Sequence, residues 1–221
     1  MNKEYYFRKL YPCQDKVLEI ISKLETGFYL TGGTASSRGY LHHRFSDDLD
    51  LFVNDNNNFG LWSDRVINGL SGAGNWQIDI LLRDERFSRA VLIEGDLLLK
   101  IEMINDVPSH IGKIRKHEIL GMLDSPENIL ANKVTAIIDR EEPKDMADIW
   151  GFCCKMGISL SEALTNAHSK AAGIFPADLA RVLCSATKTD WEEVRWIESP
   201  PLETYLKDLQ KLGDSLILLG S

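Results

Sequence analysis

The chain has 221 residues, 44% of them hydrophobic and 26% charged, with a formal net charge of −8 at pH 7. These values are typical of a globular protein with room for one large domain or two small ones. The acidic balance argues against a general binder of duplex nucleic acid, because such proteins usually neutralise phosphates with a basic surface. It still allows an RNA substrate held by a local basic patch, and it fits a site whose carboxylates await divalent cations.

The start of the chain and its cysteines predict the compartment. The segment Met1–Lys9 is charged and has no apolar h-region, so we expect no signal peptide. No apolar run approaches the roughly 20 residues that a membrane-spanning helix needs. The four cysteines form no C-x-x-C pair, which is typical of reduced thiols. We therefore expect a cytoplasmic protein without a membrane partner.

The first part of the chain mixes predicted helices and strands. Hydrophobic periodicity and turn residues define each of them. In chain order they are a helix over 14–26, a strand over 28–31, a helix over 35–42, a strand over 49–53, a helix over 59–71, and strands over 76–82, 87–93 and 97–104. The short turns between the last three strands predict a meander.

After Pro108 the sequence predicts helices alone. They span 126–140, 144–156, 160–171, 176–186 and 202–213, with Pro or Gly between them. No strand candidate is convincing in this part. The pattern therefore predicts an N-terminal α/β part that extends to about residue 120 and a helical part beyond it.

The segment Ser46-Asp47-Asp48-Leu49-Asp50 brings two carboxylates to the start of a predicted strand. Successive strand side chains point to opposite faces, so Asp48 and Asp50 share one face. Two carboxylates so close repel each other unless a cation lies between them. Their hard oxygen atoms suit Mg²⁺ or Mn²⁺, and Mg²⁺ typically takes one or two carboxylates plus substrate phosphates. The alternative is a solvated strand end, which the apolar neighbours Leu49 and Leu51 disfavour because they make this a core strand.

A third carboxylate would strengthen such a site, and the candidates are Glu102 and Asp79. Glu102 stands inside the apolar strand over 97–104, where an acid needs a partner or a metal ion. Alternation puts Lys100 on the same face, so a surface pair of Lys100 and Glu102 is the alternative. We rank Glu102 above Asp79, and we predict Asp48, Asp50 and Glu102 as catalytic metal ligands.

The residues Gly32-Gly33-Thr34 lie between a predicted strand and a predicted helix. Glycines let backbone N–H groups approach a phosphate without a Cβ in the way, and the helix N-terminus attracts anions. The hydroxyl groups of Thr34 and Ser36 can add donors. The alternative is a plain tight turn. We predict a nucleotide site made by Gly32, Gly33, Thr34 and Ser36, together with Ser46 of the carboxylate segment.

Two motifs together resemble those of a known family. Gly32-Gly33-Thr34-Ala35 followed by Arg44-Phe45-Ser46-Asp47-Asp48-Leu49-Asp50-Leu51 matches the G-G-T-A…R-x-S-x-D-L-D-L signature of the AbiEii/AbiGii toxin-like nucleotidyltransferases, within the polymerase-β-like superfamily. Further on, Lys133…Arg140…Lys144-Asp145-Met146-Ala147-Asp148-Ile149 resembles that family's K…R…[RK]-D-x-x-D-[IL] motif. The resemblance covers about residues 27–152. Ser36-Ser37 departs from the apolar residues that many members have there.

The resemblance implies an α+β fold with two domains. Residues 1–120 would be a nucleotidyltransferase core, a small mixed sheet flanked by helices, and residues 121–221 a helical C-terminal domain. It implies Mg²⁺-dependent transfer of a nucleoside monophosphate from an NTP to a hydroxyl acceptor. It also implies a toxin role in a type IV toxin–antitoxin pair, with a cognate antitoxin as partner. Some relatives act on tRNA, so RNA (tRNA) or protein is the expected acceptor.

The downstream motif also has a physical interpretation. Lys133 and Arg140 lie at i and i+7, on one helix face, and Lys133 can reach a nucleotide phosphate as a point charge. Asp145 and Asp148 share a face near the start of the next helix, where they can orient Lys133, bind a metal's waters or act as base. Arg44 can hold Asp48 or contact a phosphate. The alternative for the acids is a salt bridge that joins two helices.

Two rival functions and one surface stay open. The rivals are a small-molecule nucleotidyltransferase of the antibiotic-modifying kind and a nucleotide-binding module without turnover. A deep pocket beside Asp48 would indicate the first, and nucleotide affinity without transfer the second. Six basic residues either form an RNA-facing surface or are solvated charges: Arg83, Arg86, Arg89, Lys113, Arg115 and Lys116.

Overall fold

A computed structural model of the protein describes residues 3–218. The described chain forms two compact units, which we call the first unit (residues 3–39 and 46–125) and the second unit (residues 40–45 and 126–218). Residues 40–45, which the sequence analysis left in the N-terminal part, belong to the second unit, and residues 121–125 belong to the first. Each unit is described by itself.

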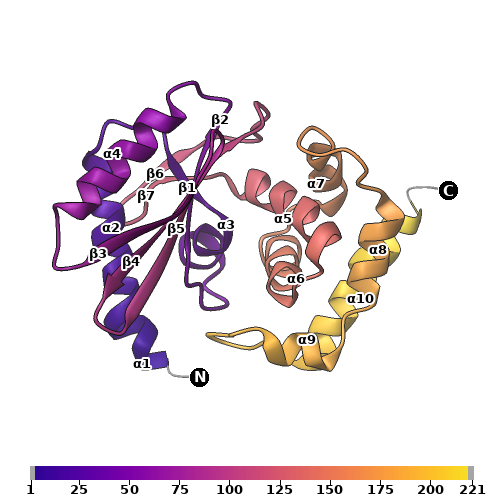
Figure 1. Ribbon diagram of the computed structural model, residues 1–221. Coiled ribbons are helices and arrows are strands. Elements are labelled where there is room, and N and C mark those ends of the chain that lie inside the picture. The colour runs from indigo at the N-terminus through magenta and orange to yellow at the C-terminus, as the bar shows by residue number, and fades with distance from the viewer. Residues whose placement is uncertain (1–2, 219–221) are drawn as a thin grey trace. The chain divides into compact units, whose positions relative to one another are not determined.

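The first unit contains a mixed sheet (Figure 1). Within residues 3–39 and 46–125 the sheet has seven strands, in the order β3-β4-β5-β2-β1-β7-β6. The strands are β1 (Tyr29–Thr31), β2 (Leu49–Asn54), β3 (Gln77–Arg83), β4 (Phe87–Glu94), β5 (Leu97–Asp106), β6 (Arg115–His117) and β7 (Gly121–Leu123). The pairs β3–β4 and β4–β5 are antiparallel, which confirms the predicted meander, and β2 pairs with β5 in parallel.

Helices cover the sheet and precede its strands. They are α1 (Lys3–Tyr5), η1 (Tyr6–Leu10), α2 (Tyr11–Lys23), α3 (Gly32–Thr34), η2 (Ala35–Leu41) and α4 (Phe59–Ser71). α2 and α4 pack against each other, and their apolar residues are buried with those of the strands (Figure 1). The core of this unit therefore forms from one stripe of each helix and one side of the sheet.

Three sequence-based expectations about the first unit were wrong in detail. The helix expected over 14–26 begins earlier and ends at Lys23. Gly32-Gly33-Thr34, expected as a turn before a helix, forms the first helical turn itself, as α3. Strands β6 and β7 lie after Pro108, where none was expected. Each of these two strands has three residues, which is too short for alternation to be visible in a sequence.

The second unit is helical. Its elements are α5 (Pro126–Arg140), α6 (Pro143–Trp150), η3 (Gly151–Lys155), α7 (Leu160–Ala167), α8 (Pro176–Cys184), α9 (Lys188–Glu193) and α10 (Leu202–Leu218). Trp150, Trp196 and Tyr205 pack edge to face in its interior, with ring centroids 5.5–6.2 Å apart. The short α9 was not expected from the sequence. No helix within residues 3–218 is both long and apolar enough to cross a membrane.

Candidate active site

The carboxylate pair lies at the start of β2. Burial alternates along this strand, so Leu49, Leu51 and Val53 are buried while Asp50 is half-buried. Asp48 precedes the strand and is also half-buried. In the sheet register Asp50 lies between Thr31 of β1 and Glu102 of β5. The alternation thus separates an apolar side of the strand from a side that presents carboxylates.

Gly32 brings the glycine segment into contact with Asp50. Its backbone has a φ of +64°, and a Cβ built on it would lie 2.0 Å from Oδ2 of Asp50. Any larger residue would therefore collide with the carboxylate and would be strained in this conformation. The lack of a side chain at position 32 leaves room for the carboxylate of Asp50. The glycine segment and the carboxylate pair, which are separate motifs in the sequence, therefore lie next to each other in the structure.

The hydroxyl groups near the glycines point inward. Thr34 Oγ1 lies 2.5 Å from the carbonyl oxygen of Asp48 and 3.1 Å from Oγ of Ser46. Ser36 Oγ donates to the carbonyl of Gly32 at 2.8 Å. Thr34 and Ser36 are fully buried, and Ser46 is nearly so. In this arrangement these hydroxyls fix the glycine segment and the start of β2, whereas Gly32 and Gly33 are partly exposed.

Two basic side chains, Lys100 and Arg89, contact the carboxylates of Asp48 and Glu102. Lys100 Nζ lies 3.0 Å from Oδ2 of Asp48 and 3.4 Å from Oε1 of Glu102. Arg89 contacts the same Glu102 oxygen at 2.7 Å. Partial burial would lower the pKa of Lys100, but its hydrogen bond to Asp48 and the nearby charges raise that pKa above its ordinary value. Lys100 therefore remains an ammonium at neutral pH and already acts as a cation between two carboxylates.

The register separates the two candidates for a third acid. Glu102 lies directly beside Asp50 on the adjacent strand. Asp79 lies on β3, which β4 and β5 separate from β2, and its carboxylate accepts from Gln77 at 2.6 Å. At about 4.8 Å between neighbouring strands, Asp79 is roughly 14 Å from β2. Glu102 is therefore the acid that the sheet brings to the pair.

The donor set suits a divalent cation held partly by substrate. Within residues 3–218 no three His, Cys, Asp or Glu side chains gather closely enough to hold a metal ion by themselves. Asp48 and Asp50 nevertheless offer hard oxygen atoms beside a bound ammonium group. Mg²⁺ commonly binds through one or two carboxylates and completes its shell with phosphates and water. The residues fit such an ion, with Asp48 and Asp50 as the protein ligands and Glu102 engaged by Arg89.

A buried cluster at the end of β1 was missed by sequence analysis. Asp124 is fully buried and accepts from Thr31 Oγ1 at 2.5 Å and from the Ser125 backbone at 2.7 Å. Nε2 of His110 lies 2.9 Å from the same carboxylate. Thr31 is the register partner of Asp50, so this cluster supports the strand that flanks the carboxylate pair. The signal was absent from the sequence because Asp124 follows a strand of only three residues.

The second unit holds a separate set of predicted site residues. Lys133 of α5 lies 2.6 Å from Asp145 and 2.7 Å from Asp148, both on α6. Arg44 contacts the two Asp148 oxygens at 2.7 Å each, in a bidentate pair. Nε2 of His43 lies 3.0 Å from the same carboxylate. Both aspartates are fully buried, and Lys133 and Arg44 nearly so. The contact between α5 and α6 is the inter-helix salt bridge that the sequence analysis kept as an alternative.

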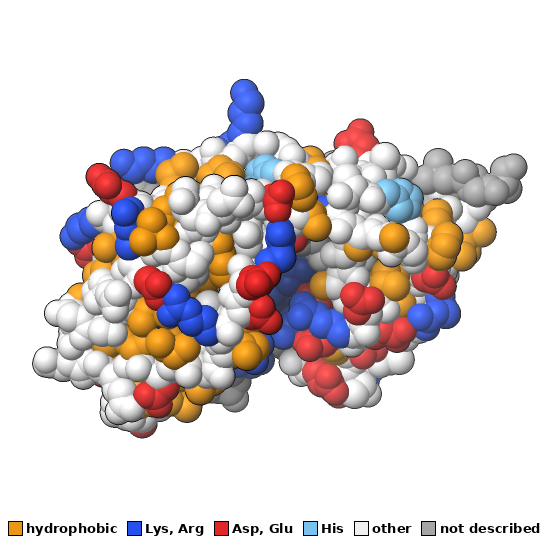
Figure 2. All heavy atoms as spheres, turned by 45° about the horizontal axis from the view of Figure 1, so that its top comes forward, with side chains coloured by type: hydrophobic (Ala, Val, Ile, Leu, Met, Phe, Trp, Pro, Cys, Tyr) orange, Lys and Arg blue, Asp and Glu red, His pale blue; other side chains and the backbone are white. Residues whose placement is uncertain are grey.

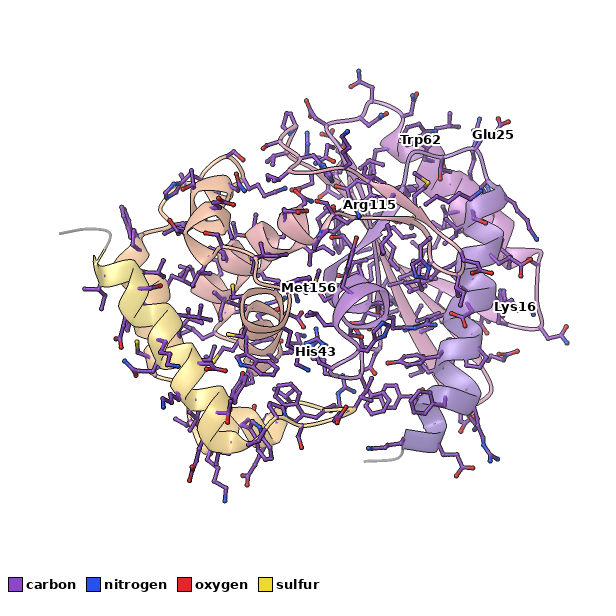
Figure 3. The ribbon with its side chains drawn as sticks, turned by 180° about the vertical axis from the view of Figure 1, so that it is seen from behind. Lys16, Glu25, His43, Trp62, Arg115 and Met156 are labelled. Atoms are coloured by element: carbon purple, nitrogen blue, oxygen red, sulfur yellow. The ribbon has the colours of Figure 1, made fainter. Side chains whose placement is uncertain are left out.

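The charges of this buried cluster stabilise one another. Burial alone would raise the pKa of the Asp148 carboxyl, but the positive charges of Arg44 and Lys133 hold it well below its usual range. Burial would lower the pKa of Lys133, yet Asp148 and Asp145 raise it above its ordinary value. Burial also lowers the pKa of His43, against the effect of Asp148. His43, labelled in Figure 3, is therefore neutral at pH 7 beside the ionised carboxylate of Asp148.

Comparison with known proteins identifies the family. The model of the family described as "Nucleotidyl transferase AbiEii toxin, Type IV TA system" matches residues 16–192. The chain belongs to this AbiEii family. It is a nucleotidyltransferase, as the sequence motifs predicted. No match was found among curated proteins.

Solved structures agree with the fold of an AbiEii nucleotidyltransferase. JHP933 from Helicobacter pylori has a TM-score of 0.65 at 18% identity, over 94% of this chain and 92% of that one. MenT4, a nucleotidyltransferase toxin from Mycobacterium tuberculosis, has a TM-score of 0.67 at 15% identity, over 94% of this chain and 82% of that one. At these identities the likeness shows the fold alone, and it confirms the predicted α+β class.

The predicted site residues of this AbiEii-family chain fall into two groups. The first unit brings together Asp48, Asp50 and Glu102 with the glycine segment Gly32–Thr34. The second unit brings together Arg44, Lys133, Asp145 and Asp148. The sequence analysis offered Lys100 as a partner of Glu102, but it missed the contact of Lys100 with Asp48 and that of Arg89 with Glu102. Alternation had put Lys100 on the right face, but only strand pairing brings Arg89 opposite Glu102.

Proposed function

We propose that this nucleotidyltransferase transfers a nucleoside monophosphate from an NTP to a hydroxyl group of RNA, with release of pyrophosphate and of the hydroxyl proton, and with a divalent cation on Asp48 and Asp50. The observation that carries the proposal is the close approach of Asp50 to Gly32, two residues after Asp48, whose backbone carbonyl accepts from Thr34 of the same glycine segment. The family supports transfer as the reaction and toxin activity within a type IV toxin–antitoxin pair as the biological role.

Each group near the carboxylates has a part in the proposed reaction. A divalent cation bound there supplies positive charge to the triphosphate and lowers the pKa of the attacking hydroxyl. Asp48 and Asp50 hold that cation. Gly32 and Gly33, at the N-terminal end of the helix formed by α3 and η2, offer backbone N–H groups to phosphate oxygens. Lys100, ion-paired with Asp48, occupies the carboxylate that the cation would bind.

Glu102 and the second-unit residues have supporting parts. Glu102 positions Arg89 and Lys100. Asp145 and Asp148 hold Lys133 as a charged ammonium and join α5 to α6, and Arg44 pairs with Asp148. The catalytic roles predicted for Lys133, Asp145 and Asp148 stay predictions. Their mutual contacts favour positioning, because each charge already has a buried partner.

The first prediction tests the carboxylate pair. Purified protein is incubated with Mg²⁺, each α-³²P-labelled NTP in turn, and total tRNA. Asp50→Asn removes one charge at nearly constant volume, and we expect transfer to fall about 100-fold or more, since metal-borne charge stabilisation is worth several kcal/mol. The melting temperature should stay close to that of the parent, because Asp50 is only half-buried.

Asp47→Asn is the matched control, because it removes the same charge one residue before Asp48. It should keep most of the activity. Full activity in Asp50→Asn would contradict the proposed site. Label on the protein itself, absent from RNA, would replace the RNA acceptor with a protein one. NTP binding without label on any acceptor would favour the small-molecule enzyme or the binding module.

A further inference from the structure

The structure divides the six basic residues that the sequence offered as an RNA-facing surface into two groups. Those on or beside β3 and β4 all have acidic partners. Arg83 pairs with Asp64 at 2.5 Å, and Arg86 pairs with Asp55 at 3.0 Å. Arg89 pairs with Glu102 at 2.7 Å. On the face that Figure 2 shows, most basic side chains likewise lie next to acidic ones. These three arginines are therefore neutralised within the protein.

The other three basic residues have no such partner. Lys113, Arg115 and Lys116 are exposed, and among the residues that the structure describes none of them forms an ion pair. They stand within four positions of the chain, on β6 and the residues just before it (Arg115 is labelled in Figure 3). The one acid in the adjoining turn is Glu118. In a chain of net charge −8, this basic edge, as we call Lys113, Arg115 and Lys116, is an uncompensated positive surface.

Comparison with the opposite edge of the sheet indicates that the basic edge does more than prevent β6 from pairing with other chains. Charged residues on an edge strand, lysine above all, prevent unwanted pairing with other chains. At the other edge, however, β3 exposes Ile80, Leu81 and Leu82, each about half accessible, and its one arginine is ion-paired. A fold that leaves that edge apolar does not require three free cations here for solubility alone. Their concentration at β6 suits a ligand of opposite charge.

The basic edge also lies at a useful distance from the carboxylates. The order β2-β1-β7-β6 puts three strand intervals between Asp50 and β6. At about 4.8 Å per interval this is roughly 14 Å. A nucleic-acid strand rises about 3.4 Å per phosphate when stacked, so phosphates about four nucleotides from a reacting end at Asp50 would reach β6. Both positions belong to the first unit, so the distance is set by the sheet itself.

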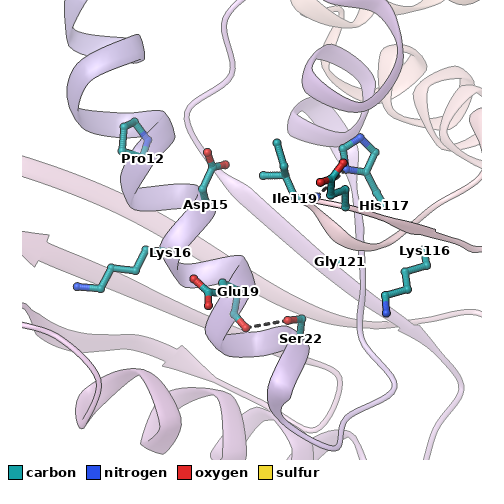
Figure 4. A pocket seen from close by; sticks show the side chains of 10 residues that line it. Pro12, Asp15, Lys16, Glu19, Ser22, Lys116, His117, Ile119 and Gly121 are labelled. Atoms are coloured by element: carbon teal, nitrogen blue, oxygen red, sulfur yellow. Dashed lines mark hydrogen bonds between the residues drawn. The ribbon is translucent and has the colours of Figure 1, made fainter.

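A groove beside β6 gives this edge depth. It has a volume of about 540 Å³ and lies between α2 and the β6–β7 hairpin (Figure 4). Lys116 and Lys16 line it, together with Asp15 and Glu19. Those two acids are already paired, Asp15 with Arg38 at 2.5 Å and Glu19 with Lys23 at 2.6 Å. On the hairpin side both Lys116 and Glu118 line the groove, so the net positive charge belongs to Lys113 and Arg115 beside it.

We propose that the basic edge binds the phosphate backbone of the RNA acceptor, upstream of the nucleotide whose hydroxyl reacts. The inference rests on the proposed function for its RNA, and it adds the surface that holds it. Phosphate contacts of this kind fix register and carry no sequence information. Lys113, Arg115 and Lys116 therefore position the acceptor, and any choice among RNA sequences lies elsewhere in the protein.

The test measures RNA binding apart from chemistry. A fluorescent 12-nucleotide single-stranded RNA is titrated with the full chain without NTP, and anisotropy is recorded at several salt concentrations. The variant is Lys113→Glu/Arg115→Glu/Lys116→Glu. The control is Arg8→Glu/Lys9→Glu/Arg65→Glu, which changes the net charge equally within the same unit at exposed residues that do not line the groove. We expect the first to weaken binding at least 10-fold and the control to change it by less than 3-fold.

Salt dependence and a milder variant complete the design. Loss of three phosphate contacts should flatten the plot of log affinity against log salt by about 2, at roughly 0.7 per contact for a single strand. Lys113→Gln/Arg115→Gln/Lys116→Gln should give an intermediate affinity, which guards against misfolding of the charge-reversed variant.

Three results would overturn the proposal in distinguishable ways. If the parent labels RNA and the charge-reversed variant binds it equally well, the basic edge is wrong and the proposed function stands. If the control loses as much affinity as the variant, only net charge matters and the edge is again wrong. If the parent does not bind RNA but labels protein or a small molecule in an Asp50-dependent manner, RNA is the wrong acceptor and the basic edge has no role in it.

Discussion

Two groups of charged side chains in this molecule follow opposite rules. At β2 and β5 the carboxylates of Asp48 and Glu102 meet Lys100, with side-chain exposures between 14% and 38%. In the second unit Asp148 meets Lys133 and Arg44, and none of the three side chains is more than 7% exposed. Water reaches the first group and is excluded from the second. Solvent access therefore separates charges that can exchange partners from charges that are fixed.

The difference teaches how one sequence pattern can mean two things. Each group contains two acids that lie two or three residues apart in a motif of the same family, Asp48 and Asp50 in one and Asp145 and Asp148 in the other. In the structure a lysine contacts each group. An exposed ion pair contributes little stability, so a substrate phosphate or a metal ion can replace either partner at small cost. A buried pair that loses one partner leaves an uncompensated charge in a medium of low polarity. The first group suits ligand binding, and the second suits a fixed position of α5 against α6.

The largest expected effect comes from removing one ammonium from each group. Lys133→Met should lower the free energy of unfolding by about 3–5 kcal/mol, because Asp145 and Asp148 would remain buried with less compensation. Lys100→Met should lower it by less than about 1 kcal/mol, because its partners stay hydrated. Urea denaturation of both variants measures the two values. Equal losses would remove the distinction between the groups.

Activity of the same variants sharpens the result. A folded Lys133→Met protein that has lost transfer but kept its stability would show that Lys133 acts on substrate. In that case the buried salt bridge would be the minor role and the catalytic prediction from the sequence the major one. A destabilised Lys133→Met protein whose remaining folded fraction is active would assign Lys133 to the support of α5 and α6.

The sequence predicted the exposed group of charged side chains more completely than the buried group. Alternation put Asp48 and Asp50 on one face of their strand, and Lys100 and Glu102 on one face of theirs, because period two is visible in five residues. It could not show that Arg89 meets Glu102, since strand pairing is a long-range property. Helical spacing brought Lys133 and the α6 acids into view, but their burial depends on how helices pack. His43 and Arg44 contact Asp148 although they are 105 and 104 positions from it in the sequence, and no local pattern reveals such contacts.

Prediction of the fold divides in the same way between local patterns, which the sequence shows, and long-range contacts, which it does not. Long elements with clear periodicity were predicted closely, and α4 and α5 begin and end where expected. The β6–β7 hairpin was missed, although its strands complete the sheet beside β1. Its three-residue strands are held by neighbours, and Arg115, Lys116 and His117 have little strand propensity of their own. Tertiary contacts make these residues a strand, and those contacts are outside the reach of a local pattern.

A smaller effect is expected from pH, and it belongs to the buried group. The folded pKa of Asp148 is depressed, so its contribution is complete above the unfolded value of about 3.9 and is lost as pH falls below it. The pKa of His43 is also depressed. Below a pH of about 6.5 the unfolded chain therefore binds a proton that the folded chain does not. The free energy of unfolding then decreases by up to about 1.4 kcal/mol for each unit by which the pH is lowered.

His43→Gln isolates the histidine part of this dependence. The amide can still donate to Asp148, but it does not titrate. We expect the fall in unfolding free energy just below pH 6.5 to flatten in this variant, while the loss at more acidic pH, from Asp148, remains. Denaturant melts at half-unit intervals from pH 4 to pH 8 measure both. An unchanged slope in His43→Gln would show that His43 does not remain neutral in the folded protein.

The smallest expected effect concerns metal use at the exposed group. Lys100 occupies the Asp48 carboxylate at 3.0 Å, so it competes with a divalent cation for the same oxygen atoms. Lys100→Met should lower the Mg²⁺ concentration needed for half-maximal transfer, by up to about 5-fold if the ion pair is worth at most 1 kcal/mol. Lys9→Met, which breaks the exposed ion pair with Asp96, is the control for a lost surface charge and should leave that concentration unchanged. A higher Mg²⁺ requirement in Lys100→Met would mean instead that the lysine assists phosphate binding, and that the exposed group is pre-organised by its own cation before metal and substrate arrive.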